Sequence, residues 1–229
     1  MSPEDDRHSR ALDAELISDL DERAKQEARN GLRQFDVVVE IIDHWLHTGR
    51  PFKLRPSAIL HLHRIALEGI SAYAGNYRPS AIEIGGSKHR PVGAHLVPEE
   101  IEKLCDYVND NWGKTAIHLA AYVMWRLNWI HPFTDGNGRT ARAVSYLVLC
   151  VRLGDRLPGR KTIPEQISVD KGPYYQALEE ADKNWKRENL DLRPMEHLLE
   201  SMLAKQLLSV HEAAIREGPA GPTGSPKLH

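Results

Sequence analysis

The stretch from Thr115 to Ile130 constrains the fold of this chain most, because it is apolar on almost every side. A surface helix keeps one polar face, whereas a helix that is apolar all round belongs in a protein core. We therefore expect a central buried helix that leads directly into His131. Apolar residues recur at helical spacing after Gly138, namely Ala141, Val144, Leu147, Val148 and Val151. A second helix is thus predicted to begin near Gly138.

The rest of the pattern predicts an all-α bundle with one small β-hairpin. Alternation in Ser80–Ile84, a turn at Gly85-Gly86 and a return strand at about Lys88–Val92 predict the hairpin. Further helices are expected from Leu12 to about Asn30 and over residues 35–46, 57–70, 98–111, 173–185 and 194–217.

Composition excludes several classes of protein. The 229 residues are 41% apolar and 27% charged, which is ordinary for a globular domain, and a net charge of −2 argues against a nucleic-acid partner. We expect no membrane span, because no apolar run reaches about 18 residues. The acidic N-terminus does not resemble a secretion signal. Cys105 and Cys150 lie in amphipathic patterns and are predicted to be buried thiols of a cytoplasmic protein.

The loop between the two central helices carries a general base and a ligand for a hard cation. His131 is the candidate base, because an imidazole with a reference pKa of about 6.5 accepts protons near neutral pH. Asp135 offers a carboxylate that suits Mg²⁺, an ion that takes about one or two protein carboxylates and otherwise binds water and phosphate.

The next residues suit an anion site. Gly136 and Gly138 lack a Cβ, so a ligand can approach the backbone closely, and Asn137 can donate from its side-chain amide. The helix start presents N–H groups and a positive dipole end. Arg139 and Arg142 share one face near this end and can bind phosphate through paired hydrogen bonds.

Each residue also has an ordinary structural interpretation. A histidine before proline is more often a satisfied loop residue than a base, and Asp-Gly-Asn-Gly is a common turn composition. Two arginines at a helix start usually form a solvated face, and Phe133 is interpreted as an aromatic anchor of the loop. The functional interpretation depends on the conjunction of all these residues at this spacing.

The segment His131–Arg142 resembles the signature of the Fic family, H-[P/x]-F-x-[D/E]-G-N-G-R-x-x-R, and matches every specified position. Weaker similarity is found in Leu62–Leu67, Tyr73–Arg78 and Tyr174–Leu178. The resemblance covers roughly residues 55–185. It implies a Fic-type helical bundle with a β-hairpin flap, and Mg²⁺-dependent transfer of AMP from ATP to a Ser, Thr or Tyr hydroxyl of a target protein.

The resemblance also implies roles for individual residues. His131 would be the base and Asp135 the Mg²⁺ ligand. The phosphates of ATP would be bound by Gly136, Asn137, Gly138, Arg139 and Arg142. Tyr175 is the candidate for the adenine pocket, although plain core packing of Tyr174 and Tyr175 is an equally good interpretation, and at most one of them should face the base.

We divide the chain into N-terminal helices (1–54), a Fic core (55–190) with the flap (78–92) and the motif (131–142), a C-terminal helix (191–217) and a flexible tail (218–229). The target protein is expected to dock on the flap edge. Many relatives carry an inhibitory [S/T]-x-x-x-E-[G/N] helix. The near match ending in Glu217-Gly218 makes Glu217 a regulatory candidate, and Ser18-x-x-x-Glu22 is a second near match.

Two other functions remain open. A Doc-like kinase, or a transferase of another nucleotide, would keep the same phosphate cradle, although such kinases typically depart from Gly-Asn-Gly-Arg. A non-catalytic nucleotide-binding module is the third interpretation, against which the intact histidine and arginines argue. An antitoxin-like inhibitor protein is a further candidate partner.

Overall fold

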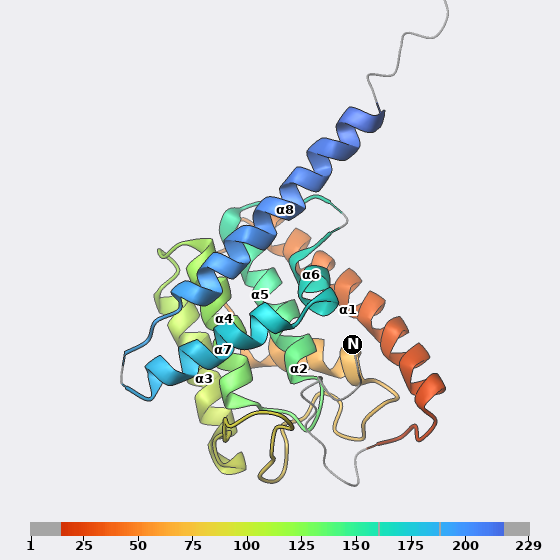
Figure 1. The fold of residues 1–229 in the computed structure, drawn as a ribbon, viewed down its shortest axis with the longest axis vertical. Helices are drawn as coiled ribbons and strands as arrows, with labels where there is room; N and C mark the ends of the chain where they lie inside the picture. Colours follow the sequence, from red (N-terminus) through yellow and green to blue (C-terminus); the bar gives the residue numbers. More distant parts are fainter. Residues whose placement is uncertain (1–14, 160, 188, 218–229) are drawn as a thin grey trace, which may run out of the picture.

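The computed structural model describes residues 15–159, 161–187 and 189–217, which are mostly helical (Figure 1). The α-helices of this part are α1 (Leu20–His47), α2 (Pro56–Leu67), α3 (Val97–Asp110), α4 (Ala116–Ile130), α5 (Asn137–Leu153), α6 (Ile163–Val169), α7 (Gly172–Trp185) and α8 (Arg193–Glu217). One turn of 3₁₀ helix, Ala94–Leu96, precedes α3. The prediction of an all-α fold is confirmed.

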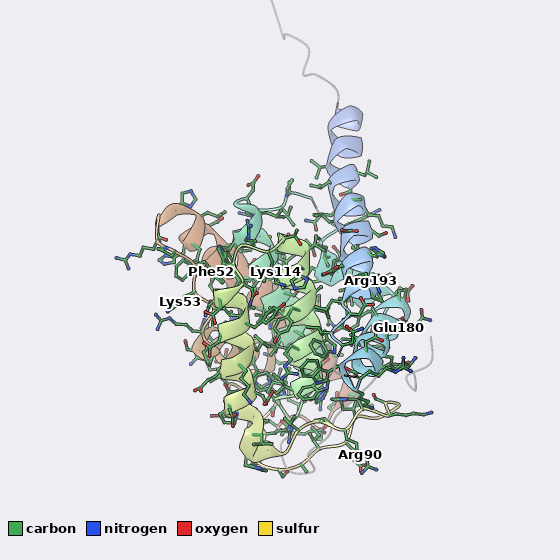
Figure 2. All side chains as sticks on the ribbon, turned by 90° about the vertical axis from the view of Figure 1, so that its left-hand side faces the viewer. Phe52, Lys53, Arg90, Lys114, Glu180 and Arg193 are labelled. Atoms are coloured by element: carbon green, nitrogen blue, oxygen red, sulfur yellow. The ribbon has the colours of Figure 1, made fainter. Side chains whose placement is uncertain are left out.

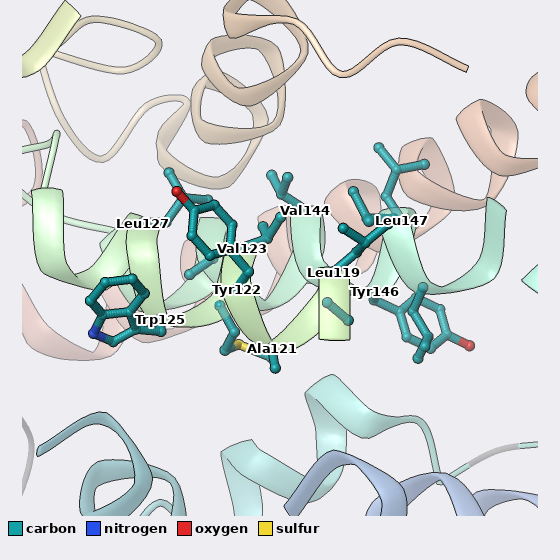
Figure 3. Packing of buried hydrophobic residues seen from close by; sticks show 14 of the residues in the cluster. Leu119, Ala121, Tyr122, Val123, Trp125, Leu127, Val144, Tyr146 and Leu147 are labelled. Atoms are coloured by element: carbon teal, nitrogen blue, oxygen red, sulfur yellow. The ribbon is translucent and has the colours of Figure 1, made fainter. Parts of the chain in front are cut away.

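Helices α4 and α5 form the centre of the fold, as the sequence predicts. Every residue of α4 from Leu119 to Leu127 is buried, and α5 is buried without a break from Ala143 to Cys150. Figure 3 shows side chains of both helices together in the core, including Val123 and Val144. Because both helices are fixed by burial, the loop that joins them is held at both ends.

Helix α1 is one continuous element, so the predicted break near Asn30-Gly31 is wrong. The Asn30 side chain is buried, and its Nδ2 donates to the carbonyl oxygens of Ala66 (3.2 Å) and Glu68 (2.8 Å) at the end of α2. Asn30 therefore caps a neighbouring helix instead of ending its own. The predicted start at Leu12 lies outside the described residues, and α1 begins at Leu20, capped by Asp19.

The predicted hairpin is also wrong, because the described residues of the flap contain a turn but no strands. The Arg78 side chain joins the two ends of the segment instead: Nη1 donates to the carbonyl of Ser80 (2.8 Å) and Nη2 to that of Val92. Pro91 has no N–H to donate to a strand ladder. The flap is therefore a loop whose two ends are joined by one guanidinium group.

A further helix end differs from the predictions, and one helix, α6, was not predicted. Helix α2 stops at Leu67 and not at Ile70, and Gly69 follows with a φ of +74°. Helix α6 is too short to produce a clear hydrophobic period, but its capping pair can be recognised in the sequence. The Thr162 hydroxyl accepts from the Glu165 amide (3.4 Å), a Thr-x-x-Glu start signal.

Helices α1 and α8 contribute buried residues to the same hydrophobic core as α4 and α5, among them Ile42 and Met195. Figure 2 shows α4 and α7 beside α8 from a second direction. The division of the chain at residues 54 and 190 stays a prediction, and the tail 218–229 lies outside the described residues.

Cys105 and Cys150 are buried and free, as predicted. Burial raises the pKa of the Cys105 thiol to about 12 and that of Cys150 to about 11, so both remain protonated and unreactive at neutral pH. Among the helices that the structure describes, none combines the length and apolar character that crossing a membrane requires.

Candidate active site

The motif loop begins where α4 ends, at His131. Its φ of 52° makes it the one non-glycine residue with positive φ in the described part of the chain. The His131 amide still donates to the Leu127 carbonyl (3.0 Å), so the residue forms the left-handed end of the helix. Backbone strain of this kind at a non-glycine residue is often found at functional sites.

The imidazole of His131 is in the right state to accept a proton. Its Nδ1 lies 3.3 Å from the carbonyl oxygen of Asn128, which can only accept, so Nδ1 carries the hydrogen. The Nε2 atom is then the acceptor, and it is buried without a hydrogen-bond partner. Burial, opposed by the hydrogen bond to Asn128, lowers the pKa of His131 to about 4, so the ring is neutral at pH 7.

Asn137 closes the loop with both ends of its amide. The Phe133 amide donates to Oδ1 (2.9 Å), and Nδ2 donates to the Phe133 carbonyl (2.9 Å). Nδ2 carries a second hydrogen, so the expectation that this side chain donates to a ligand stays a prediction. An anion could still meet the backbone N–H groups at the start of α5, which have no acceptor within the helix.

The side chain of His63, on α2, packs against the motif loop and holds it in place, a role that the sequence pattern did not indicate. Its ring stacks on Phe133 with centroids 3.6 Å apart and planes 4° from parallel. Its Nε2 donates to the Asp135 carbonyl (3.0 Å), and its Nδ1 accepts from the Gly75 amide (3.0 Å). Because one ring nitrogen donates and the other accepts, the His63 ring is neutral. Its hydrogen bond to the carbonyl positions Asp135.

This arrangement predicts a pH-dependent stability. Burial, opposed by the hydrogen bond to Asp135, lowers the pKa of His63 to about 4, whereas the unfolded reference value is about 6.5. As the pH falls, the unfolded chain binds the proton first. The native state therefore loses stability between about pH 6.5 and about pH 4, and this one ring costs about 2 kcal/mol at pH 5.

Glutamine at position 63 offers one donor and one acceptor but does not titrate. In the variant His63→Gln, the free energy of unfolding should fall by about 2 kcal/mol less between pH 7 and pH 5 than in the parent protein. Denaturant titrations at the two pH values measure this difference. The exposed His61 provides the control, and an equal fall in the parent and His63→Gln would contradict the prediction.

Gly136 and Gly138 differ in backbone conformation and in the space that a side chain would have. Gly136 has a φ of +74°, and a Cβ there would lie 2.3 Å from Cδ2 of Leu67, so no side chain fits. Gly138 has helical geometry, and its Cβ would lie 3.3 Å from Nη1 of Arg142. The first glycine is thus demanded by the packing of α2 against the loop, whereas at the second a Cβ would meet only the end of a flexible arginine side chain.

Asp135 is the electrostatic centre of the site. Its Oδ1 accepts from the Gly136 amide (2.5 Å), and its Oδ2 lies 3.2 Å from Nη2 of Arg139 and 2.9 Å from Nη2 of Arg23. Arg139 also lies 3.6 Å from Glu27. Arg23 and Glu27 come from α1 and were not predicted to belong to the site.

The number of protein ligands and the local charge decide whether Asp135 suits a magnesium ion. The described residues contain no cluster of three or more His, Cys, Asp or Glu side chains that could hold a metal by themselves. A single carboxylate nevertheless suits Mg²⁺ when phosphate and water complete its shell. Asp135 already attracts two guanidinium groups, so positive charge is favoured at this position.

All the predicted site residues except Glu217 line one cavity of about 550 Å³. The motif contributes His131, Asp135, Gly136, Asn137, Gly138, Arg139 and Arg142. Helix α7 contributes Tyr174 and Tyr175, of which Tyr174 is only 1% exposed and accepts a hydrogen bond from Asn128 (2.7 Å). Tyr175 is half-buried, which favours it over Tyr174 as the residue open to a ligand.

The flap also reaches this cavity, through His89. Its Nε2 donates to the Trp129 carbonyl (2.7 Å), and its Nδ1 lies 3.6 Å from Asp182 of α7. These contacts hold the flap beside His131. The sequence pattern placed His89 only within the predicted return strand, so its place in the cavity depends on the tertiary structure.

Glu217 stays a prediction. The last turns of α8 extend away from the rest of the fold and from the motif loop (Figure 1), and its side chain lies outside what the structure describes. Glu22, from the other near match, is exposed in the first turn of α1 and does not line the cavity. The acidic residues that α1 and the segment before it bring to the cavity are Glu15 and Glu27.

Comparison with known proteins identifies the fold. The sequence profile of the Fic/DOC family matches residues 53–149, which include the whole motif. Protein adenylyltransferase fic-1 of Caenorhabditis elegans is 36% identical over 94 residues, covering 40% of this chain and 18% of that protein. Protein adenylyltransferase Fic of Drosophila willistoni is 30% identical over 152 residues, covering 65% of this chain and 28% of that protein.

Solved structures agree on the fold. Fic-1 of C. elegans (residues 134–508, E274G) superposes with a TM-score of 0.65 at 23% identity, over 84% of this chain and 53% of that one. A Fic family protein from Desulfovibrio desulfuricans G20 gives 0.59 at 20% identity, over 90% and 57%. The chain spans less than a third of the length of the curated relatives it matches. The family profile, the complete motif and the shared fold together identify a Fic/DOC domain match over residues 53–149 of this chain.

Proposed function

We propose that this chain is a protein adenylyltransferase that transfers AMP from ATP to a Ser, Thr or Tyr hydroxyl of a target protein. The observation that carries the proposal is the buried Nε2 of His131, an acceptor without a partner in the same cavity as the start of α5. The curated relatives bear the name protein adenylyltransferase, which supports the choice of reaction.

The reaction forms a bond between the target oxygen and the α-phosphorus of ATP and breaks the bond to the β-phosphate oxygen. His131 takes the proton of the attacking hydroxyl on Nε2, and pyrophosphate leaves. Proton transfer to a positioned base typically contributes about 10²–10⁴-fold in rate. Mg²⁺, held by Asp135, would supply charge neutralisation of the phosphates.

The phosphates would lie against the start of α5. Backbone N–H groups of Asn137 and Gly138 and the helix dipole favour anions there. Arg139 and Arg142 would add charge-assisted hydrogen bonds, and Tyr175 would contact the adenine. BepC of Bartonella tribocorum, solved with bound AMPPNP, has a similar fold with a TM-score of 0.56 at 19% identity, which supports nucleotide binding by this chain.

The target protein would dock on the flap (78–92). The exposed residues of this loop, among them Ala81, Glu83 and Gly86, leave its backbone open to an extended target segment. The Arg78 clamp would keep the loop in place during docking. We also propose that the protein is cytoplasmic and that an antitoxin-like inhibitor protein is a further partner.

Labelled ATP tests the reaction. The protein is incubated with Mg²⁺, cell lysate and ATP labelled at either the α- or the γ-phosphate. Label that becomes protein-bound from the α-position alone is the expected result. Transfer of the γ-label would instead indicate a kinase, and nucleotide binding without transfer of either label would indicate a non-catalytic module.

A further inference from the structure

Arg23 of α1 enters the cavity and contacts the carboxylate assigned to the cation. Its Nη2 lies 2.9 Å from Oδ2 of Asp135, a residue 112 positions away in the sequence. Its Nη1 lies 2.8 Å from Glu15 and its Nε 3.1 Å from Glu27. The guanidinium group is thus placed in the cavity by three carboxylates from three parts of the chain.

These contacts leave Asp135 poorly accessible to a metal ion. One of its oxygens accepts from the Gly136 amide, and the other faces both Arg139 and Arg23. A divalent cation bound to that oxygen would lie beside the Arg23 guanidinium and be repelled by it. Metal binding at Asp135 therefore requires Arg23 to move away.

Two further carboxylates would retain Arg23 when its contact with Asp135 is broken. Glu15 and Glu27 each contact a different nitrogen of the guanidinium group, so the side chain keeps two ion pairs when the third is broken. Arg33, on the same helix, shows the contrast. It forms a single pair with Glu68 in which both side chains are more than half exposed, an ordinary surface ion pair.

We propose that Arg23 is a gate on the cation site. In the resting protein its guanidinium takes the place of the divalent cation at Asp135, and metal binding requires its withdrawal towards Glu15 and Glu27. The proposal rests on the proposed function only for the assignment of a divalent cation to Asp135. It differs from inhibition by Glu217, because the blocking group is a cation that acts on the metal ligand.

Mn²⁺ binding in the absence of nucleotide tests the gate, with the free ion measured by electron paramagnetic resonance. Arg23→Gln is expected to bind Mn²⁺ at least about tenfold more tightly than the parent protein, because one charged competitor at Asp135 is lost. Arg33→Gln is the matched control and should bind as the parent does. Asp135→Asn in the Arg23→Gln background should remove the gain. Equal Mn²⁺ affinity in Arg23→Gln and the parent would overturn the proposal.

A second measurement separates the gate from a third phosphate-binding arginine. ATP affinity is measured with EDTA present, so that no divalent cation takes part. A gate leaves this affinity unchanged in Arg23→Gln, whereas a phosphate ligand would lower it and overturn the proposal. Arg23→Met, of similar length and helix propensity, replaces Arg23→Gln if the latter fails to fold. Neither measurement needs transfer of AMP, so failure of the proposed function would be detected separately by the labelled-ATP assay.

Discussion

Replacing His131 with alanine is expected to lower the rate of AMP transfer by about 10²–10⁴-fold, the usual contribution of a positioned general base. The imidazole Nε2 is a buried acceptor without a partner in the cavity, and the hydrogen bond of the ring, from Nδ1 to the Asn128 carbonyl, is 3.3 Å long. Removal of the imidazole should therefore lower the free energy of unfolding only a little. ATP affinity should stay near the parent value, because this ring is assigned no contact with phosphate.

A second variant separates loss of the base from a change in the backbone. His131 has a φ of 52°, which strains alanine, whereas asparagine tolerates the left-handed region. His131→Asn should therefore keep the backbone but lose transfer to the same extent. The control is His61→Ala, which replaces an exposed histidine of α2. The rate is measured as incorporation of α-label. Activity of either His131 variant within a few fold of the parent would remove this residue as the base.

The second large effect is expected at Gly136. In Gly136→Ala the new Cβ would lie 2.3 Å from Leu67, and alanine at a φ of +74° costs a further ~1–2 kcal/mol. The loop or α2 must shift, which moves Asp135 and the first N–H groups of α5. We expect at least about a tenfold loss of ATP affinity, since about 1.4 kcal/mol of lost binding free energy suffices.

Gly138→Ala is the matched control for this prediction. Its Cβ would meet the end of the flexible Arg142 side chain at 3.3 Å, and its backbone is already helical. Its effect on ATP affinity, measured by calorimetry beside Gly136→Ala, should be much smaller. Equal losses in both variants would show that the lack of a side chain near the phosphates matters more than the packing against Leu67. Adding Leu67→Ala to Gly136→Ala should recover part of the loss.

Local signals in the sequence were sufficient for the helices of the core. The apolar run of α4 predicts its burial, because a helix with no polar face can only be placed inside a protein. The cap at Thr115 and the glycine after Leu153 mark helix ends through interactions with their own neighbours. The break predicted in α1 failed because Asn30 finds its partners on α2, which no local rule contains.

The sequence by itself determined which chemistry is present: the twelve residues of the motif, the two helices that carry them and the family signature that they match. Tertiary structure decided which side chains surround the motif residues. It brought Arg23 and Glu27 from α1 to Asp135, placed His63 under Phe133 and closed the flap with a guanidinium group where a strand ladder was expected. The physical reason is the separation along the sequence of the residues that interact. Helical periods and caps are set by residues a few positions apart, whereas the charges around Asp135 are set by how separate helices pack.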